Sequence, residues 1–161
     1  MAKIEMEVKG AKLSASSKKD ILKLSAFIAK LKPTKLNMGI VAELRGSEKM
    51  DPIKCNSAGC AMGWSPIVFP NKLVYEDNDE DTLTIATKDL KHDGVEAMVY
   101  VLKIPDFDAD ILFGAGSKTY RSPEQVAKGL KEYANTGVVP RACFEDSYDY
   151  FEYISNRLLA D

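Results

Sequence analysis

Two of the three cysteines in this 161-residue chain, Cys55 and Cys60, lie close together and just before the only tryptophan, Trp64. A cysteine near the start of a helix can have its thiolate stabilised by backbone N–H groups and by the helix dipole. Cys55 is the better placed of the two, but the only histidine, His92, lies far along the chain in what reads as an exposed turn. Because cysteine is among the most buried residue types, the sequence favours thiols that fill a close-packed site. Cys55 remains a weak candidate nucleophile.

The segment from Cys55 to Trp64 is also rich in small residues, which let a backbone pack closely. Asn56 or Ser57 can cap a helix that begins there and runs past Cys60. Pro66 and Pro70 then predict that no helix continues beyond the segment. We expect a short, buried helix in which four residues have a structural role: Gly59, Cys60, Gly63 and Trp64.

Other patterns fall short of a ligand site. The possible zinc ligands are Cys55, Cys60, Cys143 and His92, and a second close pair is missing. Residues 114–119 lack the glycine that a phosphate loop has directly before its lysine. The aspartates at 77, 79 and 81 match only the first half of a calcium loop, and those at 106, 108 and 110 read as a solvated turn. We therefore predict neither a metal site nor a cofactor.

Aromatic residues cluster with acidic ones near the C-terminus. A helix over 145–159 would place Phe151, Ile154 and Leu158 on its buried stripe. Tyr150 and Tyr153 would then flank the stripe with Asp149 and Glu152 between them. Exposed tyrosine is enriched where proteins meet their partners, so these four residues form the predicted binding surface.

Composition limits the class of protein. Hydrophobic residues make up 45% of the chain, and 22 basic and 24 acidic residues are interspersed, giving a net charge of −2. This balance is typical of one globular domain, here expected to span 1–161, and it argues against specific nucleic-acid binding. The N-terminal residues lack the apolar core of a signal peptide, and no apolar run is long enough to span a membrane. We expect a cytoplasmic protein with no membrane association.

The elements that must position these residues are mainly helical. The serines at 14, 16 and 17 can cap the start of one helix, which Pro33 ends. A second helix is predicted between Ser122 and Gly137, with a capping box at its start and a terminating glycine. Residues 72–88 form a clear hairpin pattern, and residues 3–8 read as a short strand. The pattern of 36–44 fits helix and strand equally. The prediction is an α+β fold in a single compact domain, mainly helical with a small antiparallel hairpin or sheet.

Several of these segments together resemble a family of small, uncharacterised bacteriophage and prophage proteins with a Cys-x4-Cys-x-x-Gly stretch. They are Leu31-Lys32-Pro33, 36–39, 55–64, Leu112-Phe113, and 120–127 continuing through 135–139. The resemblance implies a helix rather than a strand over 95–102, a phage origin and a cytoplasmic location in an infected cell; it supplies no catalytic residues. Asn56 departs from the family pattern, which has glycine there.

The resulting expectation is a small phage-encoded accessory protein, non-enzymatic, that binds a host or phage protein. One alternative is a cysteine-dependent enzyme or small-ligand binder centred on Cys55. Another is a self-associating protein that uses the same aromatic surface.

Overall fold

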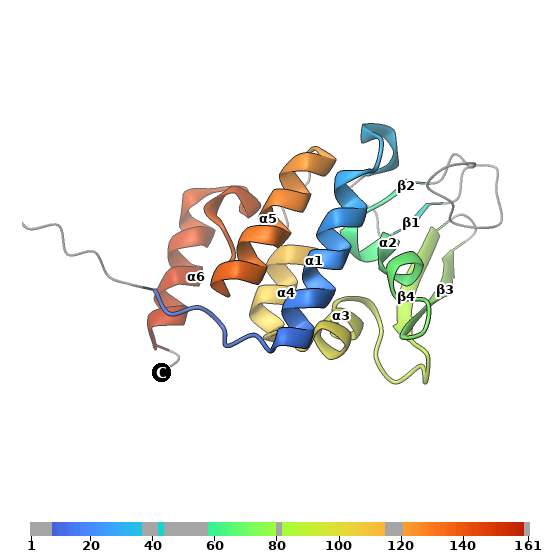
Figure 1. Cartoon of the computed structure of the whole chain (residues 1–161), viewed down its shortest axis with the longest axis horizontal. Helices are drawn as coiled ribbons and strands as arrows, with labels where there is room; N and C mark the ends of the chain where they lie inside the picture. The colour runs from blue at the N-terminus through green and yellow to red at the C-terminus, as the bar shows by residue number, and fades with distance from the viewer. Residues whose placement is uncertain (1–7, 37–41, 44–57, 80–81, 115–120, 160–161) are drawn as a thin grey trace, which may run out of the picture.

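The computed structural model describes residues 8–36, 42–43, 58–79, 82–114 and 121–159 (Figure 1). In chain order, its helices and strands are α1 (Ala15–Ala29), β1 (Ala42–Glu43), β2 (Ala58–Gly59), α2 (Ala61–Val68), β3 (Leu73–Asp79), β4 (Thr82–Thr87), α3 (Gly94–Leu102), α4 (Asp106–Phe113), α5 (Pro123–Thr136) and α6 (Ser147–Leu159). Two short 3-10 helices, Pro33–Lys35 and Arg141–Cys143, complete the list. The predicted α+β fold, mainly helical with a small antiparallel sheet, is confirmed.

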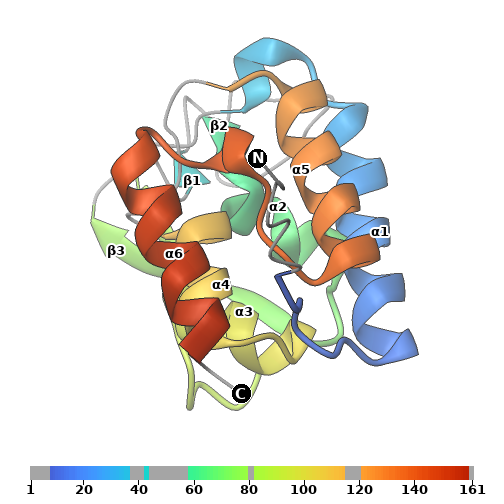
Figure 2. The ribbon, with the colours of Figure 1, turned by 90° about the vertical axis from the view of Figure 1, so that its left-hand side faces the viewer.

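Helices α1 and α5 lie side by side in the middle of the molecule, with the sheet at one end and α6 at the other (Figures 1 and 2). Ser14 caps α1 by accepting a hydrogen bond from the Ser17 N–H, and the predicted stripe of Ile21, Leu24 and Ile28 is buried. The Ser25 hydroxyl donates to the Ala127 carbonyl at 2.6 Å, which ties α1 to α5.

Helix α5 has the predicted capping box and termination. Ser122 and Gln125 exchange side-chain and backbone hydrogen bonds, and Pro123 occupies the first turn. Gly137 ends the helix with a φ of 68°, where a Cβ would lie 2.2 Å from the Ala11 carbonyl oxygen. Only glycine fits this close crossing of two backbones.

The sheet has strand order β2-β1-β4-β3, with all pairs antiparallel. The predicted hairpin over 72–88 is confirmed as β3 and β4. Ala42 and Glu43 form β1, so this part of the undecided segment 36–44 is a strand. The predicted strand at 3–8 lies outside the described residues, except for Val8.

The expected course of the chain after Cys55 needs two corrections. The helix begins at Ala61 rather than before Cys60, because Ala58 and Gly59 pair with β1 and Cys60 serves as the N-cap. The helix also continues through Pro66 to Val68. Pro66 has no N–H for the Met62 carbonyl, and this carbonyl accepts the Ser65 hydroxyl instead, so the helix tolerates the proline.

Residues 94–102 form a helix, as the resemblance implied, but the acidic turn expected at 105–110 is wrong. Helix α4 begins at Asp106, and Asp106 and Asp108 lie in its first turn, where carboxylates stabilise a helix N-terminus. Asp108 is fully buried rather than solvated. Among the described residues, no helix is both long and apolar enough to cross a membrane.

Candidate functional site

The Cys60–Trp64 segment makes the contacts of a packing unit. The Cys60 Sγ accepts a hydrogen bond from the Gly63 N–H at 3.4 Å, and the Gly63 carbonyl accepts the Tyr75 hydroxyl at 2.6 Å. Trp64 is fully buried and its Nε1–H donates to the Lys35 carbonyl at 2.8 Å. Burial raises the pKa of the Cys60 thiol to about 11, so this cysteine is a poor nucleophile at neutral pH.

The other residues considered for chemistry are not gathered into a site. Burial raises the pKa of the Cys143 thiol, although Arg121 beside it acts in the opposite direction. The imidazole Nδ1 of His92, in the loop before α3, lies 3.0 Å from a carboxylate oxygen of Glu96 in the first turn of that helix. Within the described ranges, no three metal-binding side chains come together. Cys55 lies outside these ranges, so its role stays a prediction.

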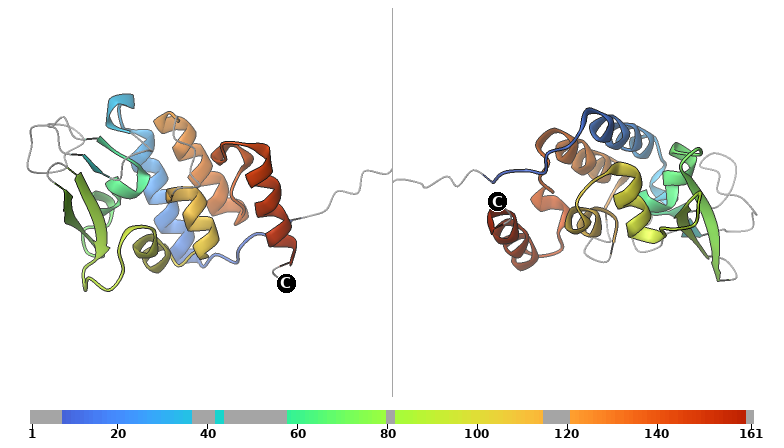
Figure 3. Two further views of the ribbon diagram at one scale, coloured as in Figure 1. Left: turned by 180° about the vertical axis from the view of Figure 1, so that it is seen from behind. Right: turned by 90° about the horizontal axis from the view of Figure 1, so that it is seen from below.

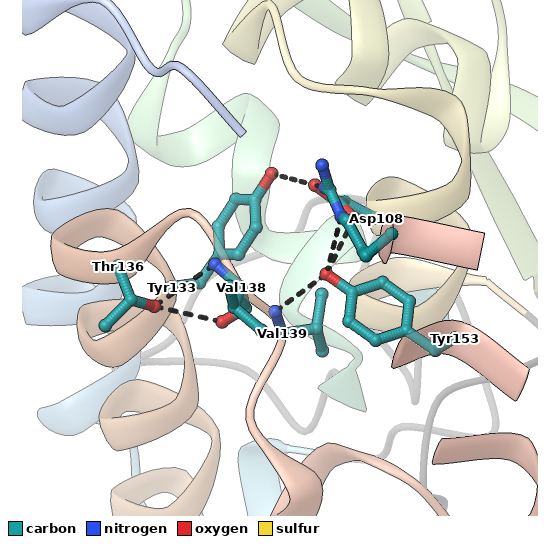
Figure 4. Close-up of polar contacts among 7 residues, drawn as sticks. Asp108, Tyr133, Thr136, Val138, Val139 and Tyr153 are labelled. Atoms are coloured by element: carbon teal, nitrogen blue, oxygen red, sulfur yellow. Dashed lines mark hydrogen bonds and ion pairs between the residues drawn. The ribbon is translucent and has the colours of Figure 1, made fainter. Parts of the chain in front are cut away.

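In the part of the chain that the structure describes, the carboxylate of Asp108 in α4 has partners on two other helices (Figure 4). The Tyr133 hydroxyl of α5 donates to its Oδ2 at 2.5 Å, and the Tyr153 hydroxyl of α6 donates to its Oδ1 at 2.9 Å. The guanidinium of Arg157, also on α6, forms an ion pair with Oδ2. We call these four residues the Asp108 cluster; through them one buried carboxylate joins three helices.

The Tyr153 hydroxyl connects the cluster to the backbone. It accepts hydrogen bonds from the Val139 N–H at 2.9 Å and from the Arg157 Nε at 3.3 Å. Burial raises its pKa to about 12, and the neighbouring Asp108 acts in the same direction, so the phenol stays neutral and can donate. The pKa of Tyr133 is raised by burial and by Asp108 as well. Burial alone would lower the pKa of Arg157. The hydrogen bonds to Asp108 and Tyr153 have a larger combined effect, so the pKa of Arg157 is raised.

This anchoring decides which side of α6 faces the core, and it reverses part of the sequence prediction. Tyr153 is fully buried, with its ring stacked against Phe107 at 5.5 Å between centroids, so its predicted place on the surface is wrong. Phe151 and Leu158, expected in the core, are 66% and 37% exposed. Tyr150 and Ile154 are half-buried.

The exposed side of α6 carries an apolar strip that we call the α6 outer face: Tyr148, Phe151 and Leu158. Tyr148 is 75% exposed, and the spacing of the three residues places them on one side of the helix. Asp149 and Glu152 are exposed, and their spacing places both along the Tyr148 edge of the strip. Figure 3 shows α6 at the end of the molecule from behind and from below, away from the sheet.

Sequence reasoning missed Asp108, Tyr133 and Arg157 as a group. Two signals were present. An aspartate lies three and four positions before Ile111 and Leu112, on the apolar side of α4, and a tyrosine and an arginine lie four positions apart on α6. A tyrosine and an arginine one helical turn apart can reach the same acceptor.

A scan against models of known protein families and searches of curated proteins and of solved structures found no match to this chain. The α6 outer face therefore has to be interpreted from its own chemistry.

Proposed function

We propose that this chain is a small phage-encoded accessory protein, cytoplasmic and without catalytic activity, which binds a protein partner through the α6 outer face. The observation that carries the proposal is the exposure of Tyr148 and Phe151 on one side of one helix. Aromatic residues are enriched in protein interfaces and provide much of the binding energy there. The resemblance to phage and prophage proteins supports the cellular setting.

The anchoring of α6 suits it to binding. Tyr153 and Arg157 are held by Asp108 on the inner side of the helix, and Arg141 lies over the ring of Tyr150 at 5.8 Å. The outer face is consequently already oriented in the unbound chain. Association then loses less conformational entropy than it would if the helix had to form on binding.

The charges beside the strip indicate the kind of partner. Glu152 is exposed one helical turn after Tyr148, and Asp149 is exposed one turn before Glu152, so a complementary surface would pair an apolar patch with basic residues beside it. Of the four predicted binding residues, Asp149 and Glu152 are exposed, Tyr150 is half-buried and Tyr153 is buried, so Tyr148 and Phe151 take the place of the two predicted tyrosines. A second copy of the chain is the alternative partner, and the sedimentation measurement below distinguishes it.

The two cysteines described by the structure support a non-enzymatic role, because burial raises the pKa of both Cys60 and Cys143. Fast, selective modification of Cys55 would instead favour the alternative of an enzyme or small-ligand binder centred on that residue.

The test is a double substitution of Tyr148 and Phe151 by serine, with partner capture from infected cells and sedimentation as measurements. Loss of two interface aromatics should weaken association by about 2 kcal/mol or more, or about 30-fold, and leave the melting temperature nearly unchanged. A matched pair provides the control: Leu158→Ser on the outer face and Leu22→Ser on α1, where the leucines are 37% and 38% exposed.

Only the outer-face variants should lose the partner. Equal capture by wild type and by the double variant would overturn the proposal. Concentration-dependent sedimentation of the wild type that disappears in the double variant would instead identify a second copy as the partner.

A further inference from the structure

A groove of about 730 Å³ is lined by residues from the base of the β3–β4 hairpin, the loop after it and the C-terminal part of α3. The hairpin lies at the end of the molecule opposite α6 (Figure 1). Its size is within the range of small-molecule sites, about 300–1,000 Å³. Its lining combines an apolar base, formed by Val101 and Ile104, with one exposed aromatic ring, Tyr100, and with lysines. None of these residues belongs to the α6 outer face.

Tyr100 provides a flat surface at the groove. Its side chain is 58% exposed, and it also lines a smaller cavity of about 430 Å³ together with His92. The His92 ring stacks on the Tyr100 ring with 4.7 Å between centroids and 22° between planes. This stacking fixes the orientation of the phenol ring, so a planar ligand group would meet a preformed surface.

The groove has an excess of positive charge. Lys88 and Lys103 line it, and neither ammonium group has a carboxylate partner among the residues that the structure describes. The third lysine, Lys72, already pairs with Asp20 at 2.8 Å. The only carboxylate of the lining, Asp89, accepts hydrogen bonds from the Thr87 hydroxyl and the Lys91 N–H, which occupy part of it. Two lysines are thus available to an anion.

Hydrogen bonds between Thr87 and His92 close the loop that carries Lys88. The Thr87 N–H donates to the His92 carbonyl at 2.8 Å, and the Thr87 hydroxyl accepts from the His92 N–H at 3.2 Å. Two residues beside the groove, Leu90 and Lys103, have positive φ angles of 59° and 52°, which are unfavourable for side-chain-bearing residues. The Leu90 N–H donates to the Thr87 carbonyl at 2.8 Å, which helps to hold the turn, so the loop side of the groove is preorganised.

We propose that this groove binds a small aromatic anion, with its ring on Tyr100 and its charged group between Lys88 and Lys103. A nucleoside monophosphate has this chemistry, since a flat base and a phosphate are joined by a short linker. The assignment is independent of partner binding by α6, and either can fail without the other.

The experiment is a titration of the ¹⁵N-labelled full chain with AMP, followed by the backbone amide signals of Tyr100 and Lys103. Adenosine and inorganic phosphate serve as the two halves of the probe. We expect saturable shifts at the groove, and AMP binding at least about tenfold tighter than either half, because charged hydrogen bonds and stacking each contribute on this scale. Added salt should weaken AMP binding and leave adenosine unaffected.

Two variants and one control test the residues. Lys88→Gln with Lys103→Gln should weaken AMP binding about tenfold or more, and Tyr100→Leu should also weaken it about tenfold. Lys18→Gln with Lys19→Gln removes two exposed charges from α1 outside the groove and should leave binding unchanged. Thermal melting confirms that each variant is folded, and the salt dependence of the wild type tests the charge contribution without any substitution.

Three outcomes would overturn the proposal. The first is the absence of saturable shifts at Tyr100 and Lys103 with millimolar AMP. The second is adenosine binding as tightly as AMP, which would remove the role of the lysines. The third is an equal loss of affinity in the α1 control, which would show only a general effect of net charge.

Discussion

Replacement of Asp108 by asparagine should destabilise the protein more than its conservative shape suggests. The carboxylate accepts from Tyr133 and Arg157 on Oδ2 and from Tyr153 on Oδ1. An asparagine has one acceptor oxygen and one donor nitrogen. Whichever way the amide is turned, at least one donor of the cluster would face another donor.

The magnitude follows from burial. The Asp108 side chain is fully buried, and that of Arg157 is only 13% exposed. Removing one partner of a buried ion pair costs about 3–5 kcal/mol, because the remaining charge stays uncompensated. For a domain of this size, each kcal/mol lowers the melting temperature by about 2–4 °C, so a decrease of about 10 °C is expected.

Urea denaturation followed by circular dichroism measures the loss of stability, with Asp106→Asn and Asp110→Asn as controls. Both control residues belong to α4 and are exposed. Asp106→Asn removes a first-turn carboxylate and should cost at most about 1 kcal/mol, and Asp110→Asn should change the free energy of unfolding by less than about 0.5 kcal/mol. Amide exchange should accelerate most in α6, which depends on Asp108 for two of its anchors. A stability equal to that of Asp106→Asn would refute the description of this carboxylate as a buried, three-way acceptor.

Two further predictions concern ionisable groups. The folded-state pKa of Tyr153 is raised from 10.0 to about 12 and that of Cys60 from 9.0 to about 11, so the unfolded chain loses these protons first as the pH rises. The stabilisation by these two groups should therefore be fully present below about pH 9 and be lost between about pH 9 and 12. The Tyr153→Phe variant should lose less stability over this range. Urea midpoints of the wild type that stay constant from about pH 9 to 12 would contradict the prediction. In the native protein, iodoacetamide should modify Cys60 and Cys143 far more slowly than in urea, because both are buried with raised pKa values. Peptide mass spectrometry measures the extent of modification of each cysteine separately. Fast, selective modification of Cys55 would favour the enzyme alternative.

The sequence predicted best those elements whose signals are local. Helix α5 has its cap, its first-turn proline and its terminating glycine within its own residues, and all three were readable. The β3–β4 hairpin likewise depends on neighbouring residues. The extent of α2 was harder, because a thiol serves as its N-cap and the Ser65 hydroxyl compensates for Pro66.

The candidate site was harder still, because its orientation is set by a distant residue. On α6, a stripe of Phe151, Ile154 and Leu158 satisfies helical periodicity as well as the side that is actually buried. The choice between the two sides depends on Asp108, on another helix, which read as one of three solvated aspartates. Periodicity identifies that a helix has a buried side, and long-range hydrogen bonding decides which one.

The burial of Trp64 gives the protein an internal optical reporter. As the only tryptophan, fully enclosed between Phe27 and the Lys35 carbonyl, it accounts for the indole emission of the whole chain. It belongs to α2, and α2 lies on the far side of α1 and α5 from α6 (Figure 1). Its emission should thus shift to longer wavelength when the core opens and stay constant when α6 alone detaches. Fluorescence and amide exchange recorded on the same sample can therefore distinguish release of the C-terminal helix from global unfolding.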